Sequence, residues 1–122
     1  MSKHGVVHIE ISAEDPQAAS QFYAELFGWN MVIDERFDYH QFEPAEGPAG
    51  AFNPVSENNP AGTVIIYFDT DDVDASLAKA EALGAKVMVP RMEIPDVGWI
   101  GIFSDPSGNP IGLFQSARKA TG

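Results

Sequence analysis

The sequence contains no cysteine among its 122 residues. Disulfide scaffolds, thiolate metal sites and cysteine nucleophiles are therefore excluded. It also lacks a run of about 18 apolar residues, the length that crosses a bilayer. The first four residues, Met-Ser-Lys-His, contain no apolar stretch typical of a signal peptide. These absences predict a cytoplasmic protein without a membrane partner.

Positive charge is scarce in this chain. Seven Lys and Arg residues stand against eighteen Asp and Glu residues, which gives a formal net charge of −11. A surface of this sign repels nucleic acid and anionic lipid. We therefore expect no nucleic-acid partner, and we interpret the charge mainly as a contribution to solubility.

The first half of the chain reads as a strand, a helix and three short strands. Val6 to Ile11 alternates between polar and apolar residues, which predicts a half-buried strand. Asp15 and Pro16 are typical of a helix N-cap and first turn, and Gly28 is typical of a helix end. Three short β-prone segments follow, at 29–33, 39–42 and 49–52.

The same order then restarts. A β-rich run at 63–68 precedes a helix that Asp72 begins and Gly84 ends, and a strand at 87–89 follows. A hairpin over 98–115, which turns at Asp105-Pro106-Ser107-Gly108, supplies two more strands. Gly50 to Phe52 also echoes Gly112 to Phe114, with one residue inserted in the preceding turn.

We therefore predict one α+β domain over 1–122 that contains two βαβββ modules. The first module spans 5–53, a proline-bearing linker spans 54–62, and the second module spans 63–116. Each module alone leaves one sheet face open, so the two are expected to pair into a curved mixed sheet with the helices on its outer face.

Strand alternation divides the side chains between the two faces. The outer face under the helices is predicted to receive Val7, Ile9, Ile11, Val64, Ile66 and Phe68. The concave face, a trough, is predicted to receive His8, Glu10, Gly50, Phe52, Ile65, Tyr67, Gly112 and Phe114, with Trp99 as a further lining residue.

These motifs resemble the vicinal oxygen chelate superfamily, which includes glyoxalase I, bleomycin-resistance proteins and extradiol dioxygenases. The matching segments run in order from about Val6 to Gln115, and they are His8 in the first strand, Asp15-Pro16, Phe22-Tyr23, Phe27-Gly28-Trp29, Asp71-Asp72-Val73-Asp74-Ala75, Ile94 to Trp99 and Asp105 to Asn109. The resemblance implies a glyoxalase-like fold and a homodimer. Activities of the small members of this kind are mostly unassigned.

Active members of the superfamily place one metal ion in the trough, held by His or Glu residues from the first and last strand of each module. The resemblance maps these positions to His8, Gly50, Ile65 and Gly112. Glycine and isoleucine carry no donor side chain, so only His8 is able to act as a ligand. We therefore expect no metal or other cofactor, with a divalent ion at a non-standard site as the alternative.

His8 and Glu10 are the candidate catalytic residues. His8 is either a remnant ligand that contacts a substrate or a structural histidine, and Glu10 is either a general base or a solvated carboxylate. Gly50 and Gly112 either widen the trough for a flat ligand or mark a bulge or a dimer contact. The cluster Asp69, Asp71, Asp72 and Asp74 lacks the calcium-loop pattern and is interpreted as helix capping.

Three hypotheses follow, in order of preference. The first is a metal-free protein that binds a small apolar or aromatic molecule, as bleomycin-resistance proteins do. The second is a lyase or isomerase of the glyoxalase class, or a dioxygenase-related enzyme, in which His8 and Glu10 transfer a proton next to a carbonyl group. The third is a partner-interaction domain whose trough is closed by side chains.

Overall fold

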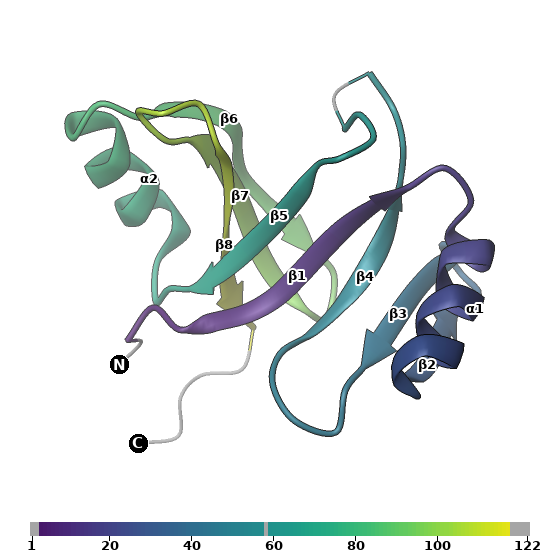
Figure 1. Cartoon of the computed structure of the whole chain (residues 1–122). Coiled ribbons are helices and arrows are strands. Elements are labelled where there is room, and N and C mark those ends of the chain that lie inside the picture. Colours follow the sequence, from purple (N-terminus) through teal and green to yellow (C-terminus); the bar gives the residue numbers. More distant parts are fainter. Residues whose placement is uncertain (1–2, 58, 118–122) are drawn as a thin grey trace. The chain divides into compact units, whose positions relative to one another are not determined.

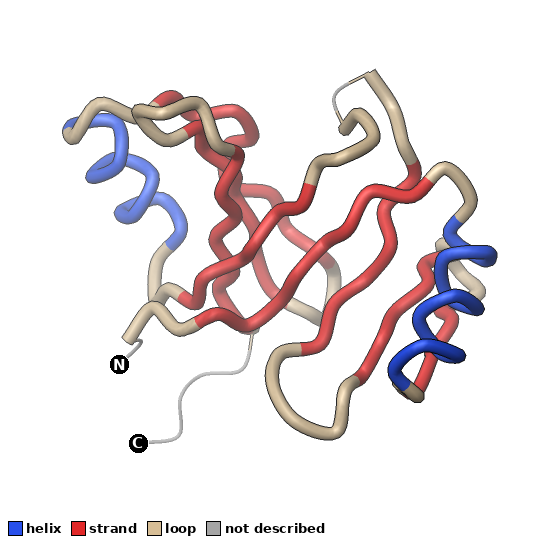
Figure 2. Tube along the Cα trace, in the orientation of Figure 1, coloured by secondary structure: helices blue, strands red, loops and turns tan. Residues whose placement is uncertain are grey.

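The computed structural model describes residues 3–57 and 59–117. The first two residues and residue 58 of the predicted linker lie outside the described residues. The order strand, helix and three strands occurs twice along the chain (Figures 1 and 2). The predicted α+β class with two βαβββ modules is confirmed. Neither helix in the described ranges is long and apolar enough to span a membrane.

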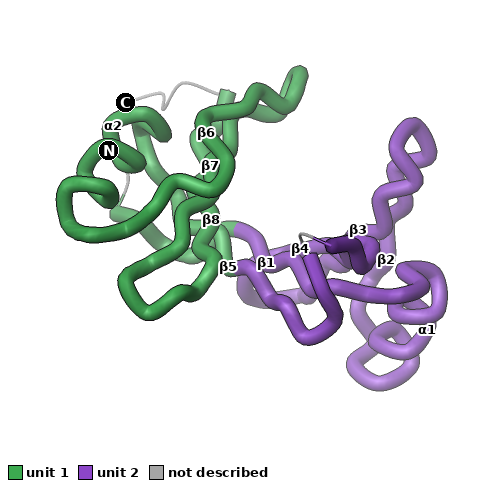
Figure 3. The backbone as a smooth tube through the Cα atoms, turned by 90° about the horizontal axis from the view of Figure 1, so that it is seen from above, with its two compact units in different colours: residues 1–7, 66–122 green, residues 8–65 purple. Residues whose placement is uncertain are grey.

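The chain divides into two compact units (Figure 3). The N-terminal unit contains residues 8–65, and the C-terminal unit contains residues 1–7 together with 66–122. In each unit we call the side of the sheet opposite that unit's helix the helix-free face. The two units are described in turn.

The N-terminal unit consists of a four-stranded sheet and one helix. Its elements are β1 (Val6–Ala13), α1 (Pro16–Phe27), β2 (Asn30–Asp34), β3 (Tyr39–Glu43) and β4 (Ala49–Pro54). The strands lie in the order β2-β3-β4-β1. Strands β1 and β4 are parallel, whereas β2 with β3 and β3 with β4 are antiparallel.

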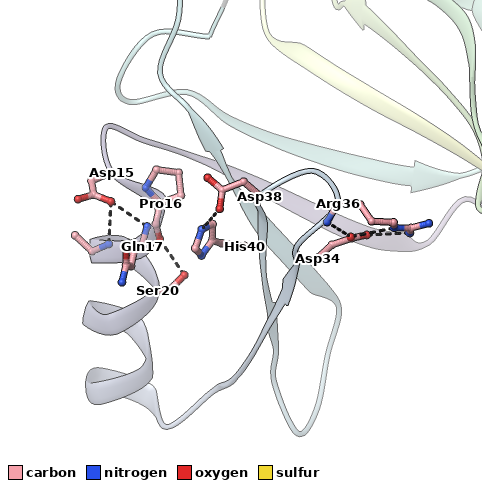
Figure 4. Close-up of polar contacts among 9 residues, drawn as sticks. Asp15, Pro16, Gln17, Ser20, Asp34, Arg36, Asp38 and His40 are labelled. Carbon is pink, nitrogen blue, oxygen red and sulfur yellow. Dashed lines mark hydrogen bonds and ion pairs between the residues drawn. The ribbon is translucent and has the colours of Figure 1, made fainter.

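Helix α1 begins and ends where the sequence predicts. The Oδ1 atom of Asp15 accepts hydrogen bonds from the backbone N–H groups of Gln17 at 3.1 Å and Ala18 at 3.2 Å (Figure 4). At the other end Gly28 has a φ of 71°, and its N–H donates to the Ala24 carbonyl at 2.8 Å. Both caps satisfy backbone groups that a helix leaves unpaired at its ends.

Aromatic rings fill the space between α1 and its sheet. Tyr23 on α1 stacks on Phe52 of β4 with the ring centroids 5.4 Å apart, and Trp29 stacks on Phe42 of β3 at 4.5 Å. Phe42 and Phe52 are 2% and 1% exposed. These rings form the core of the unit, because burial of large apolar side chains is the main stabilising contribution.

The C-terminal unit repeats this plan. Its elements are β5 (Val64–Asp69), α2 (Val73–Ala82), β6 (Lys86–Ile94), β7 (Gly98–Ser104) and β8 (Pro110–Ser116), in the sheet order β5-β8-β7-β6. The core consists of Val73 and Leu77 on α2 and Leu113 on β8. Gly101 on β7 permits the close approach of α2, because an added Cβ there would press on Val73 and Leu77.

Strand β6 is longer than the predicted segment 87–89. It reaches Ile94 despite Pro90, because β6 is the edge strand of this sheet and one side of an edge strand needs no ladder donors. A tight turn then leads into β7, with the Val97 N–H donating to the Ile94 carbonyl at 2.9 Å. The second half of this strand is hard to predict from the sequence, because Pro90 is untypical of a strand interior.

Candidate functional site

A polar cluster lies on the helix-free face of the N-terminal unit. Three side chains share one hydroxyl group: the Tyr39 hydroxyl lies 3.1 Å from His8 Nε2 and donates to Glu10 Oε2 at 2.9 Å. His8 Nε2 and Glu10 Oε2 are 3.5 Å apart. Asn53 Nδ2 reaches the other carboxylate oxygen of Glu10 at 3.5 Å. We call His8, Glu10, Tyr39 and Asn53 the polar cluster.

Strand geometry brings these residues together. His8 and Glu10 project to the same side of β1 because they are two residues apart. Glu10 pairs with Ala51 on β4, and Ala51 pairs with Gln41 on β3, so the cluster crosses three neighbouring strands. Tyr39 is two residues before Gln41 and therefore shares its face.

The turn before β3 fixes the position of Tyr39. Arg36 donates to the Asp34 carboxylate through its backbone N–H, its Nε and its Nη2, at 3.1, 3.2 and 3.1 Å (Figure 4). The side-chain hydrogen bonds from Arg36 lower the pKa of Asp34 below its usual value. Asp34 also pairs with Tyr39 in the β2–β3 ladder, so this turn places the tyrosine at the first position of its strand.

The cluster has a defined direction of hydrogen bonding. A tyrosine hydroxyl has one proton, and here that proton points to Glu10. The hydroxyl oxygen is then left to accept from Nε2 of His8. The side chains of His8 and Glu10 are 27% and 17% exposed, so both are accessible to a small molecule. The carboxylate of Glu10, the hydroxyl group of Tyr39 and the imidazole of His8 lie close enough together to contact one small ligand at the same time.

Two residues predicted for the trough lie instead on the helix-covered face of this unit. Phe52 pairs with Ile11 and stacks on Tyr23 of α1, and Gly50 pairs with Ile9. Residues paired across neighbouring strands share a face. The prediction that Phe52 and Gly50 face the trough is therefore wrong.

The single inserted residue explains this error. Gly50 pairs with Ile9 on β1. Gly112, which matches Gly50 in the repeated sequence pattern, pairs instead with Tyr67 on β5. Tyr67 holds the position in the second module that Glu10 holds in the first. Ala51, not Gly50, is thus the counterpart of Gly112. A shift of one residue exchanges the two faces of a strand, and the echo by itself does not reveal that shift.

In the C-terminal unit the predicted trough residues are divided. Leu113 faces α2, so Gly112 and Phe114 on either side of it lie on the helix-free face, where the Tyr67 ring covers Gly112. Trp99 does not join them: it packs against the core under α2, and the Arg91 guanidinium carbon lies 5.7 Å from its ring centroid. The prediction that Trp99 lines the trough is wrong.

Ile65 and Tyr67 keep the predicted alternation along β5. Both are buried, with 8% and 4% of their surface exposed, so each offers little area to a ligand. A role in ligand binding for Ile65, Tyr67, Gly112 and Phe114 stays a prediction.

His40 belongs to the opposite face from the polar cluster. It pairs with Phe52 on β4, and its Nε2 lies 3.1 Å from Asp38 Oδ1 (Figure 4). Its Nδ1 is buried and has no hydrogen-bond partner among the residues that the structure describes. His40 therefore does not supply a second imidazole to His8.

The metal ion implied by the superfamily resemblance does not fit these residues. Within residues 3–57 and 59–117, no three His, Asp or Glu side chains come together in a way that could hold a metal ion. On β4 the residue that shares the face of His8 and Glu10 is Ala51, which like Gly112 has no donor side chain, and a Cβ added at Gly112 would collide with the Tyr67 ring. The Tyr67 ring occupies the space that a ligand side chain at Gly112 would need.

Tyr39 and Asn53 are members of the polar cluster that the sequence patterns do not reveal. Tyr39 was recognised as part of a strand, but the face it shares with Glu10 depends on the register across β4. Asn53 was assigned to the end of a module, whereas β4 continues to Pro54 and carries Asn53 beside Ser12. The alternation of side chains along β3 puts Tyr39 and Gln41 on one face. Only the pairing of β3 with β4, and of β4 with β1, shows that this is the face of Glu10.

Comparison with known proteins agrees with this architecture. The family model of the glyoxalase-like domain matches residues 8–114. A Mycobacterium tuberculosis protein named "Putative glyoxylase CFP32" is 32% identical over 117 residues, which cover 90% of this chain and 45% of that protein. Anthracycline biosynthesis protein DnrV from Streptomyces peucetius is 26% identical over 125 residues, covering 87% of this chain and 45% of that protein. The chain thus spans about half the length of these curated relatives.

Solved structures show the same fold. Hypothetical protein BH1468 from Bacillus halodurans superimposes with a TM-score of 0.73 at 12% identity, over 98% of this chain and 99% of that one. Methylmalonyl-CoA epimerase from Mycobacterium tuberculosis superimposes with a TM-score of 0.66 at 16% identity, over 93% of this chain and 89% of that one. At these identities the likeness concerns the fold alone. The family match over residues 8–114 shows that this chain belongs to the glyoxalase-like domain family of the vicinal oxygen chelate superfamily.

Proposed function

We propose that this chain binds a small organic molecule at the polar cluster, without a metal ion. The observation that carries the proposal is the shared Tyr39 hydroxyl, which joins His8 and Glu10 at 3.1 and 2.9 Å on an accessible sheet face. Polar groups that converge in this way fix the orientation of a ligand. The names of two relatives, a glyoxylase and an anthracycline biosynthesis protein, support a small organic ligand.

The ligand is expected to carry a hydroxyl group that donates to Glu10 and accepts from Tyr39 or His8. Such a ligand would replace the internal hydrogen bond between Tyr39 and Glu10 with two bonds of its own. An apolar molecule of the same shape would leave the cluster unchanged and gain nothing from it.

The test compares 1-naphthol with naphthalene by titration calorimetry. We expect 1-naphthol to bind more tightly, and Tyr39→Phe to reduce its affinity by about 2- to 10-fold, the effect of one hydrogen bond. Tyr23→Phe is the matched control, because Tyr23 lies under α1 on the other face of the sheet. Equal affinities of the two compounds, or equal effects of the two variants, would refute binding at this cluster.

A second candidate function is proton transfer next to a carbonyl group. It is favoured by the 3.5 Å separation of His8 and Glu10, which places a base and a hydrogen-bond donor on one reacting centre. Glu10 would take the α-proton, leaving an enolate whose oxygen accepts a hydrogen bond from His8 or Tyr39. Delivery of a proton from solvent to the opposite face of the enolate, with loss of the Glu10 proton to solvent, would invert the carbon with no net change in protons or electrons.

Racemisation of a single enantiomer of S-phenyl 2-phenylpropanethioate tests this candidate. We expect the chain to accelerate racemisation and Glu10→Gln to slow it by at least about a hundredfold, as loss of a general base does. Glu43→Gln, an exposed carboxylate on β3, is the matched control. Unchanged racemisation with Glu10→Gln would exclude this role and leave the binding function.

A further inference from the structure

A shallow cavity of about 450 Å³, widely open to solvent, lies beside α2 in the C-terminal unit. This volume is within the usual range of small-molecule sites. Its walls come from Phe68 on β5, Ile111 on β8, Phe103 on β7 and Leu83 at the end of α2. None of the residues of the polar cluster lines it, so it is independent of the function proposed above.

The cavity exists because α2 covers its sheet unevenly. The helix packs mainly on β6, β7 and β8, through Val73 and Leu77. On the side toward β5 the helix presents Ser76 and Ala80, whose small side chains do not fill the space above Phe68. Apolar surface is left partly exposed there, as the 72% exposed Leu83 illustrates. Burial of this surface by a ligand would be favourable.

Two basic side chains, Lys79 and His4, line these apolar walls, and the His4 Nδ1 atom lies 2.9 Å from the Asp69 carbonyl oxygen. Lys79 borders the cavity and takes part in no ion pair within the part of the chain that the structure describes. Asp105 also borders it, but its carboxylate accepts from Ser107 N and Asn109 N at 2.9 Å each and from Asn109 Nδ2 at 3.2 Å. The hydrogen bonds from Asn109 lower the pKa of Asp105. Asp105 is thus held by its own turn and leaves Lys79 available.

We propose that this cavity binds an amphiphilic monocarboxylate, with the carboxylate on Lys79 and an apolar body against Phe68, Ile111 and Leu83. Lysine is suited to this arrangement because its aliphatic stem lies along apolar surface while its ammonium group pairs with an anion. In a chain with seven basic residues and a net charge of −11, Lys79 supplies the attraction for an anion, and the negative charge of Asp105 confines the ligand's carboxylate to the Lys79 side of the cavity.

Titration calorimetry with decanoate, below its micelle concentration, tests the site. We expect saturable binding of one decanoate, and an approximately tenfold loss of affinity in Lys79→Gln, in line with the loss of a charge-assisted hydrogen bond. 1-Decanol should bind the wild type and Lys79→Gln equally, because it has no charge. Lys86→Gln is the matched control, since Lys86 on β6 does not line the cavity.

A second variant separates the cavity from surface charge. Ala80→Leu should abolish binding of both decanoate and 1-decanol by filling the cavity, with thermal unfolding used to verify the fold. If Ala80→Leu fails to fold, methyl NMR shifts of Ile111 and Leu83 on addition of decanoate to the wild type provide the same information. The proposal is overturned if decanoate does not bind, or if it binds and both variants leave its affinity unchanged. It is also overturned if sedimentation shows a second copy of the chain occupying this surface, with Leu83→Asp shifting the protein to monomer.

Discussion

Phe52→Ala is expected to lower the free energy of unfolding by about 4 kcal/mol, near the middle of the range for a buried phenylalanine. Phe52 is 1% exposed and contacts rings from two elements, Tyr23 on α1 at 5.4 Å and Phe42 on β3 at 5.3 Å. Removing its ring leaves a cavity between the helix and the sheet that both neighbours line. Urea unfolding with linear extrapolation measures the change.

The matched control is Phe37→Ala. Phe37 is 71% exposed in the turn before β3, where its described ring contact is with the guanidinium of Arg36. Its removal should cost less than about 1 kcal/mol. If Phe52→Ala were as mild as Phe37→Ala, Phe52 would not belong to the core, and the ligand-lining role predicted from the sequence would regain support.

The order of helices and strands was predictable from the sequence. The two βαβββ modules, the Asp15 and Asp72 caps and the final hairpin are each encoded by residues close together in the chain, and all are present. Local signals of this kind act through the backbone of a few neighbouring residues. They do not depend on which strands become partners, and the order of elements was therefore predictable.

The faces of the strands were predictable only in part. His8 and Glu10 were assigned to one side of β1, which the contacts between them confirm. Phe52 and Trp99 were assigned to the wrong side, because their faces depend on the register with β1 and on packing under α2. A one-residue difference in register inverts the whole strand, and sequence similarity between the two modules cannot resolve so small a shift.

The polar cluster could be predicted only as a pair. Its third member, Tyr39, lies 29 residues from Glu10 in the sequence and reaches it through two strand pairings, β3 with β4 and β4 with β1. Neither of these strand pairings produces a recognisable pattern among residues that are close together in the sequence. Of the acidic cluster near α2, Asp72 is confirmed as a helix cap, because its Oδ1 accepts from the Ala75 N–H at 3.0 Å.

Gly50→Ala is expected to destabilise the chain by about 3 kcal/mol, the upper part of the usual cost of overpacking. The added methyl group would collide with the Ile9 carbonyl on the neighbouring strand and with the Phe42 ring in the aromatic core. A flexible side chain would move aside at small cost, but here one neighbour is backbone and the other is a phenylalanine that is 2% exposed. Urea unfolding again measures the effect.

Gly5→Ala is the control for Gly50→Ala, since an added Cβ at Gly5 meets no atom within 4 Å. It should change the free energy of unfolding by no more than about 0.5 kcal/mol. A Gly50→Ala protein as stable as Gly5→Ala would mean that β4 has room for a side chain at this position. The large cost that we expect means instead that the aromatic core under α1 leaves no room for a side chain at Gly50.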